Sequence, residues 1–495
     1  MVTMSKGHAK IGLSEGIGAI GTGSVGRRWQ LRQLASDTFV YAVTMLLVRL
    51  LTFLLTPLYT NVLQPEAFGE VSYLFALLAF ANVVLALGWE SAYMRFAAER
   101  QGEARRAVFA YAWGTMVVNG ALLCLGVWIA APVLAPVLQL SRLGAEGVRA
   151  AALVMLLDGV AVVPLAELRL RRRPLWYGGL RLVNAVVQVA ATVLFVLVWR
   201  WGAPGVLWAG VVASASTAVG TAPVIARLFR WQWQAGLYWE MLRYGLPAVP
   251  AALASIALHV VDRPLLMLLA DAQAVGIYQA NYRLALPMLL MVTVFEYAWR
   301  PFFLQQAQRP DGPQLFAAVF WRWNLTAALF FVGMVLWIPV LAQMPIGGGF
   351  LIHPDYWEGL DIVPIVAAGY VLFGIYVFAA AAAHIRKRTE RLAGAMILAA
   401  VTNIGLLLLL VPWLGYRGAA WATLGAYTVA ALAMLLFAQR LYPVPYPWGR
   451  VGGVWGIAGI VAILGMGSPI IGRLLWSVVA VGLLWGWWRI WRGSV

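Results

Sequence analysis

Long apolar runs separated by short polar segments dominate the chain. A helix that crosses the hydrocarbon core of a bilayer needs roughly 20 mostly apolar residues. Runs of this kind are predicted as spans at about residues 38–60, 70–93, 107–136, 147–168, 177–199, 204–227, 243–268, 275–299, 315–342, 362–384, 392–413, 417–438, 450–467 and 470–488. The pattern predicts an all-α integral membrane protein of about fourteen transmembrane helices.

The polar segments between the runs test this helix count. Every second segment carries basic residues, in the groups Arg27, Arg28 and Arg32; Arg100, Arg105 and Arg106; Arg169, Arg171, Arg172 and Arg173; Arg227 and Arg230; Arg300 and Arg309; Arg386, Lys387 and Arg388; Arg440 and Arg450; and Arg489 and Arg492. The alternate segments 61–70, 269–274 and 343–361 carry none. Because cytoplasmic loops are enriched in Lys and Arg, both termini are expected in the cytoplasm. Residues 1–36, which are Gly-rich and weakly basic, are expected to form a disordered cytoplasmic tail.

Composition supports a membrane location and excludes several soluble classes. The chain is 63% hydrophobic and 11% charged, whereas ordinary soluble domains are about 45–50% apolar and about 25% charged. The net charge of +17 does not indicate nucleic acid, because the basic residues occur in small groups between apolar runs. The one cysteine, Cys124, cannot form an internal disulfide.

The two halves of the chain repeat a spacing. The first half contains a GxxGxxWA string that begins at Gly202, and the second contains the same string beginning at Gly415. Gly69 and Gly276 occupy similar turns in the two halves. Since six helices per half is an even number, both copies enter the membrane from the same side, which predicts parallel repeats related by an axis along the membrane normal. The expected division is a six-helix lobe at 37–230, a second six-helix lobe at 240–441 and two accessory helices at 449–495.

Short motifs in fixed order add a family resemblance. They are Leu-Val-Arg-Leu-Leu-Thr at 47–52, Leu-Gln-Pro-Glu-Ala-Phe-Gly at 63–69, Gly-Trp-Glu-Ser-Ala at 88–92, Tyr-Gly-Leu-Pro at 244–247, Asp262-Arg263 and Val-Gly-Ile-Tyr at 275–278. Over about residues 35–440 the chain resembles the polysaccharide transport (O-antigen flippase) branch of the multidrug/oligosaccharidyl-lipid/polysaccharide exporter superfamily. The resemblance implies two lobes around a central cavity, no cofactor, and a bacterial inner-membrane location. It also implies transport of an undecaprenyl-diphosphate-linked oligosaccharide between the leaflets.

Charges inside the predicted spans are the candidate site residues. An ionised side chain near the centre of a membrane helix costs at least roughly 2.5–3.5 kcal/mol, so it usually faces a partner or a wet cavity. Arg49 and Arg283 are the first candidates for contact with a substrate diphosphate, because arginine matches phosphate oxygens well. Arg263 is a third candidate, beside Asp262 and near His259. The alternative for this last group is an ion pair that only holds helices together.

The remaining intramembrane charges have other expected roles. Asp158 either pairs with Arg49 or takes up a proton as a coupling carboxylate. Charges nearer the cytoplasmic ends are expected to snorkel or to close a gate: Glu90, Arg95, Arg181, Glu296 and Arg300. The four histidines are scattered and lack metal-ligand spacing, so no metal site is expected.

Two other function classes compete with a flippase. A cation-coupled drug exporter of the same superfamily would share the two lobes but should carry an acid-rich cavity, which Arg49 and Arg283 oppose. A membrane-bound sugar transferase would need several positioned catalytic groups in an outer loop. The longest outer loop, 343–361, is short and is expected to be a solvated connector. The predicted partners are the lipid-linked oligosaccharide and membrane lipids, and an ion or the membrane potential is the candidate driving force.

Overall fold

The computed structural model describes residues 24–230 and 235–491, which form α-helices and one short β-hairpin. The first half and the connector comprise α1 (Ser24–Val62), α2 (Pro65–Ala86), α3 (Trp89–Ala98), α4 (Gly102–Val137), α5 (Gly144–Leu170), α6 (Pro174–Thr192) with the π-helical η1 (Val193–Val198), α7 (Gly202–Leu228) and α8 (Ala235–Gly245). The second half comprises η2 (Leu246–Ala248), α9 (Val249–Val260), α10 (Asp262–Leu269), α11 (Ala272–Leu284), α12 (Leu286–Gln306), α13 (Gly312–Ala342), β1 (Pro345–Ile346), β2 (Gly349–Phe350), η3 (Pro354–Asp361), α14 (Ile362–Ile385), α15 (Glu390–Leu414) and α16 (Tyr416–Leu441). Two further helices follow, α17 (Trp448–Met466) and α18 (Ile470–Trp491).

The all-α membrane fold is confirmed, with 13 helical segments of the described residues long and apolar enough to cross a membrane. The predicted span that does not qualify is 275–299, which falls on two helices, α11 and α12, separated at Ala285. Pro287 lies in the first turn of α12. Because proline lacks a backbone N–H and its ring clashes with the preceding turn, it starts a helix here and cannot continue one. The predicted tail 1–36 overlaps α1, which begins at Ser24, and residues 1–23 lie outside the described residues.

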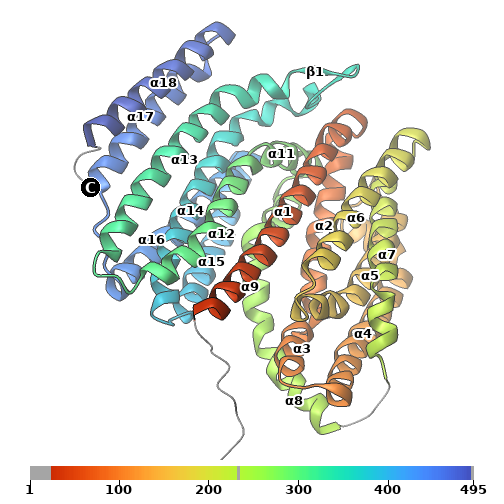
Figure 1. The fold of residues 1–495 in the computed structure, drawn as a ribbon. Helices are drawn as coiled ribbons and strands as arrows, with labels where there is room; N and C mark the ends of the chain where they lie inside the picture. The colour runs from red at the N-terminus through yellow and green to blue at the C-terminus, as the bar shows by residue number, and fades with distance from the viewer. Residues whose placement is uncertain (1–23, 231–234, 492–495) are drawn as a thin grey trace, which may run out of the picture.

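The repeated glycine motif occupies the same place in both halves. Gly202 is the first residue of α7 and Gly415 directly precedes α16, and both have a left-handed backbone, with φ of 63° and 55°. Glycine adopts this conformation without a steric penalty. The second glycine of the motif also requires a small residue, because a Cβ on Gly418 would lie 2.6 Å from the carbonyl oxygen of Leu410. Figure 1 shows the two halves side by side, with α1–α7 in red to yellow-green and α11–α16 in green to blue.

The two halves meet backbone to backbone at the end of the bundle that carries the hairpin, which we call the hairpin end. A Cβ on Gly69 of α2 would lie 1.8 Å from the carbonyl oxygen of Ala272, and one on Gly276 of α11 would lie 1.9 Å from that of Pro65. The paired glycines of the repeat therefore allow α2 and α11 to touch. The opposite end, which carries the basic loops, is called the arginine end.

The loop 343–361 fastens the hairpin end. The amide nitrogen of Asn61 donates to the carbonyl of Phe350 (2.6 Å), whose own N–H donates back to the Asn61 side chain (3.0 Å). The Tyr356 hydroxyl donates to the carbonyl of Leu63 (2.8 Å), and Tyr356 is fully buried. We call these three bonds the latch. The loop is exposed over residues 343–348, as expected of a solvated connector, but it also joins the second half to the end of α1.

The last two helices pack outside the two halves. Arg473 of α18 donates to the carbonyl of Leu336 in α13 (2.9 Å), and the Trp337 indole donates to Ser477 (3.1 Å). The Trp455 indole of α17 donates to the side chain of Asn324 (3.0 Å). Figure 1 places α17 and α18 beside α13, at the edge of the bundle farthest from α4–α7.

Candidate functional site

One face of α1 is polar and points toward the other half. Arg49, Thr52, Thr56 and Tyr59 follow one another three, four and three residues apart, a spacing that places them on one side of a helix. The Nη1 of Arg49 donates to the hydroxyl of Thr293 in α12 at 3.3 Å. This face therefore contacts the second half along the C-terminal half of α1.

Arg283 makes the reciprocal contact from the second half. Its Nη1 donates to the hydroxyl of Thr56 in α1 at 3.4 Å. Its guanidinium also lies over the rings of Tyr59 (5.7 Å) and Phe68 (5.5 Å). Each half thus contributes one arginine that donates to a threonine of the other half. We call Arg49 and Arg283 the interlobe arginines.

The interlobe arginines are not neutralised. Within residues 24–230 and 235–491, neither guanidinium has a carboxylate oxygen within 4.0 Å. Arg283 is half-buried and Arg49 is exposed. An arginine carries five N–H donors, and a single long hydrogen bond to a hydroxyl leaves most of them free. Each guanidinium therefore has donors available for an anion at the interface between the halves.

Arg263, the third candidate, lies in a closed network. Its Nη1 is 2.7 Å from Asp262 Oδ1, and its Nε donates to Gln279 at 2.9 Å. Its guanidinium also lies 4.8 Å from the centre of the Tyr282 ring, and the Tyr278 hydroxyl donates to Asp262 at 2.6 Å. Arg263 and Asp262 are both buried. This arrangement matches the alternative of a structural ion pair.

His259 joins this network through its backbone. Its carbonyl accepts a hydrogen bond from Nη1 of Arg263 at 2.5 Å. Its ring is exposed, and Nδ1 lies 2.9 Å from the carbonyl oxygen of Ser255 in the same helix. The ring therefore contacts neither Asp262 nor Arg263 through a bond in the described structure, and the ion pair consists of Asp262 and Arg263.

Asp158 is placed away from the interlobe arginines. It is half-buried in α5 and accepts a hydrogen bond from the Ser214 hydroxyl at 2.7 Å. The nearby cation is Arg181, which is close enough to act on it electrostatically. The predicted pairing of Asp158 with Arg49 is not present, because Asp158 faces α7 within its own half. Its protonation during transport stays a prediction.

The charges expected at the cytoplasmic ends form local pairs. Glu90 of α3 binds Arg169 of α5, and Arg95 binds Glu99 one turn along its own helix. The Nη2 of Arg300 lies 2.6 Å from Glu296, also one turn away. Exposed pairs of this kind contribute little to stability. Arg181 stacks on Tyr177, with 5.7 Å between its guanidinium and the ring centre.

The partners of the interlobe arginines were not among the residues predicted from the sequence. Thr56 and Tyr59 lie seven and ten residues after Arg49, so helical spacing alone could have found them. Thr293 lies in the other half, and no local pattern connects it to Arg49. A buried cluster around Glu167 was also missed and is described below.

Comparison with known proteins gives both a family and a fold. The sequence profile of the family described as "Polysaccharide biosynthesis protein" matches residues 34–306. No curated protein sequence matches the chain significantly. The lipid II flippase MurJ in an inward closed conformation is 14% identical, with a TM-score of 0.75 over 92% of this chain and 99% of that one.

Two other solved transporters share the fold. An inward-facing MATE family multidrug resistance transporter of the MOP superfamily is 14% identical, with a TM-score of 0.64 over 84% of this chain and 99% of that one. A MOP superfamily transporter from Pyrococcus furiosus, whose binding pocket is described as having reverse polarity, is also 14% identical. It has a TM-score of 0.57 over 86% of this chain and 96% of that one. At these identities the likeness establishes the fold alone.

Proposed function

The chain belongs to the polysaccharide biosynthesis protein family of the MOP superfamily, and from this membership we propose that it is a flippase for a polyprenyl-diphosphate-linked oligosaccharide. As a multi-pass membrane transporter of this family, it is not an enzyme. In the proposed reaction the lipid-linked sugar passes from the cytoplasmic to the outer leaflet. The two halves alternate access to a substrate held between them.

The reciprocal contact of the interlobe arginines is the observation that carries this proposal. A diphosphate must lose water to enter the membrane, and fixed guanidinium groups offset part of that cost. Arg49 comes from α1 and Arg283 from α11, so a diphosphate bound by both would connect the two halves. We propose that these two residues hold the diphosphate, and that Arg263 supports the fold around them.

The same contacts support alternating access. In the present structure the halves touch at the hairpin end through Gly69 and Gly276 and through the latch. Substrate release to the outer leaflet would require these contacts to open. If the basic loops lie in the cytoplasm, as their charge predicts, the described conformation is closed toward the outside.

The experiment is transport of a fluorescent polyprenyl-diphosphate oligosaccharide in proteoliposomes. Wild-type protein is compared with Arg49→Ala, Arg283→Ala and the control Arg440→Ala, which removes an exposed arginine at the end of α16. Transport by the wild type and the control, with loss in the two interlobe variants, supports the proposal. Transport that survives both interlobe changes would remove the diphosphate site but keep the function. Efflux of a cationic dye without lipid transport would instead indicate a drug exporter.

Energy coupling is a separate part of the proposal. Asp158 is the proposed coupling carboxylate, because it is half-buried and its bonded partner is the neutral Ser214 hydroxyl. Transport should be measured under an imposed proton gradient, a sodium gradient or a membrane potential. If Asp158 takes up the driving proton, Asp158→Asn abolishes acceleration by the proton gradient. An undiminished acceleration in that variant would exclude Asp158.

A further inference from the structure

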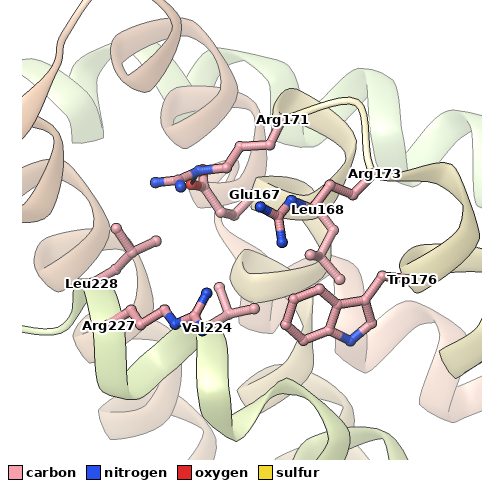
Figure 2. Close-up of a pocket in the computed structure, with 8 residues that line it drawn as sticks. All are labelled: Glu167, Leu168, Arg171, Arg173, Trp176, Val224, Arg227 and Leu228. Atoms are coloured by element: carbon pink, nitrogen blue, oxygen red, sulfur yellow. Dashed lines mark hydrogen bonds and ion pairs between the residues drawn. The ribbon is translucent and has the colours of Figure 1, made fainter.

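A pocket at the arginine end of the first half has no part in the proposed transport path. It lies where the last turns of α5 and α7 meet the first turn of α6, and Figure 2 shows its lining. The lining residues are Glu167, Leu168, Arg171, Arg173, Trp176, Val224, Arg227 and Leu228. In Figure 2 the side chains of Arg173, Trp176 and Arg227 surround the open centre.

The one carboxylate of this pocket is already occupied. Glu167 is buried, with 1% of its surface exposed. It binds Nη2 of Arg105 at 2.6 Å, Nε of Arg171, and the hydroxyl of Tyr93. Because the single negative charge of Glu167 already faces two guanidinium groups, those of Arg105 and Arg171, it does not neutralise the arginines across the pocket.

Arg173 and Arg227 therefore leave the pocket with an excess of positive charge. In the part of the chain that the structure describes, neither has a carboxylate oxygen within 4.0 Å. Arg173 lies 5.8 Å from the ring centre of Trp176 and is the N-cap of α6 without a side-chain capping bond. The positive end of the α6 dipole adds to the charge of the two side chains.

The surroundings of the pocket are those of a membrane interface. The arginines lie at the ends of three candidate spans, Gly144–Leu170, Pro174–Val198 and Gly202–Leu228. Beside them, Leu175 of α6 is 76% exposed and Val219 of α7 is 73% exposed. Trp176 lies in the first turn of its span, and tryptophan prefers the level of the lipid headgroups. A ligand of this pocket would therefore have a phosphate at the arginines and apolar chains along α6 and α7.

We propose that this pocket binds the phosphate of an anionic phospholipid. Arg173 and Arg227 donate to the phosphate oxygens from opposite sides, and the acyl chains lie on the exposed faces of α6 and α7. The bound lipid joins the ends of α5, α6 and α7. This site is independent of the proposed flippase function, because it contains neither interlobe arginine.

The test is lipid binding by the purified full-length protein, measured by native mass spectrometry. Phosphatidylglycerol, phosphatidylethanolamine and inorganic phosphate are titrated separately. The variant Arg173→Ala/Arg227→Ala is compared with Arg388→Ala/Arg440→Ala, which removes two exposed arginines from the arginine end of the other half. An attraction of about 1 kcal/mol per basic residue predicts roughly 30-fold weaker phosphatidylglycerol binding in the first variant and none of this loss in the second.

Three results would overturn the proposal. The first is unchanged phosphatidylglycerol binding in the folded pocket variant. The second is equally tight binding of phosphatidylethanolamine, which would show that the pocket does not distinguish lipids by their net charge. The third is displacement of the lipid by inorganic phosphate at equal concentration, which would assign the pocket to the free anion. If the double variant unfolds on heating well below the wild type, Arg173→Gln and Arg227→Gln are measured singly, each with an expected loss of roughly fivefold.

Discussion

Arg263 and Arg283 are two arginines of the same half, yet their surroundings are opposite. Arg263 is 7% exposed and is held by Asp262, Gln279 and the carbonyl of His259. Arg283 is half-buried, and within the described residues its hydrogen-bond partner is the Thr56 hydroxyl of the other half. Both were candidates for substrate contact from the sequence. The structure separates them by what their donors already bind.

The difference shows which membrane charges are available to a ligand. Arg263 would have to break its bonds to a buried carboxylate before it could bind a phosphate, and this exchange is costly in a low dielectric. Arg283 needs only to release a neutral hydroxyl, and two aromatic rings partly stabilise its charge meanwhile. The surroundings of Arg263 are typical of a structural residue, and those of Arg283 are typical of a binding site.

The largest effect should come from breaking the buried pair. In Arg263→Ala, Asp262 loses its cation in a buried position, and removal of one partner of a buried pair typically costs about 3–5 kcal/mol. We expect low yields of folded protein and a clearly lower unfolding temperature, measured by size-exclusion chromatography after heating. The double variant Asp262→Asn/Arg263→Gln should recover part of the loss. A folded Arg263→Ala protein with wild-type stability but no transport would instead assign Arg263 to the substrate site.

Arg283→Ala should keep its stability but lose transport, which is the opposite of what we expect for Arg263→Ala. Its guanidinium has no carboxylate partner, so its removal leaves no buried charge behind, and we expect an unfolding temperature close to that of the wild type. A charge-assisted hydrogen bond to a phosphate is worth about 1.5–3 kcal/mol, which corresponds to a transport rate lower by roughly 10- to 100-fold. The proteoliposome assay measures this rate. Arg283→Lys should retain part of it, because lysine keeps the charge but not the fork of donors.

Arg49→Ala should lower transport less than Arg283→Ala. The Arg49 guanidinium is exposed, and water weakens its electrostatic interactions. We expect a roughly threefold to tenfold loss, because an exposed bond should be worth about 0.7–1.4 kcal/mol, the range of an ordinary hydrogen bond. Thr293→Ala removes only its present hydroxyl partner (3.3 Å) and is the matched control, with transport near the wild-type rate. If Thr293→Ala lowered the transport rate as much as Arg49→Ala, the Arg49–Thr293 contact would be the feature that transport needs, and not a free Arg49 cation.

The sequence predicted the fold better than the site for a physical reason. Span length, the alternation of basic loops and the two GxxGxxWA motifs are local patterns, and the helices of both halves follow them. The break at Ala285 was missed because a hydropathy average over 275–299 does not register the new helix start marked by Pro287. The partners Thr293 and Tyr356 were missed because each bond joins residues more than 200 positions apart, which no single-sequence pattern records.

The smallest predicted effect concerns the latch, which lies at the hairpin end. Tyr356→Phe removes the bond to the Leu63 carbonyl, and one hydrogen bond is worth about 0.5–1.5 kcal/mol. The closed state should therefore become less favoured by roughly twofold to tenfold. Thr56→Cys, in a Cys124→Ser background, reports this opening as faster labelling by a water-soluble thiol reagent. Ala280→Cys is the control, since Ala280 is fully buried within α11, and its labelling should not respond to the latch.

This measurement decides whether lobe closure is what shields Arg283. Thr56 contacts Arg283 across the interface, so its labelling rate reports the surroundings of that arginine, whereas Ala280 reports the interior of one half. Faster labelling at Thr56→Cys alone would show that the surroundings of Arg283 change with the lobes. Equal acceleration at both positions would instead mean that Tyr356→Phe loosens the second half itself, and unchanged labelling at both would show that the latch does not hold the halves together. In either of those cases Arg283, like Arg263, would be buried by packing that does not depend on lobe closure. The two arginines would then differ only in their bonding partners.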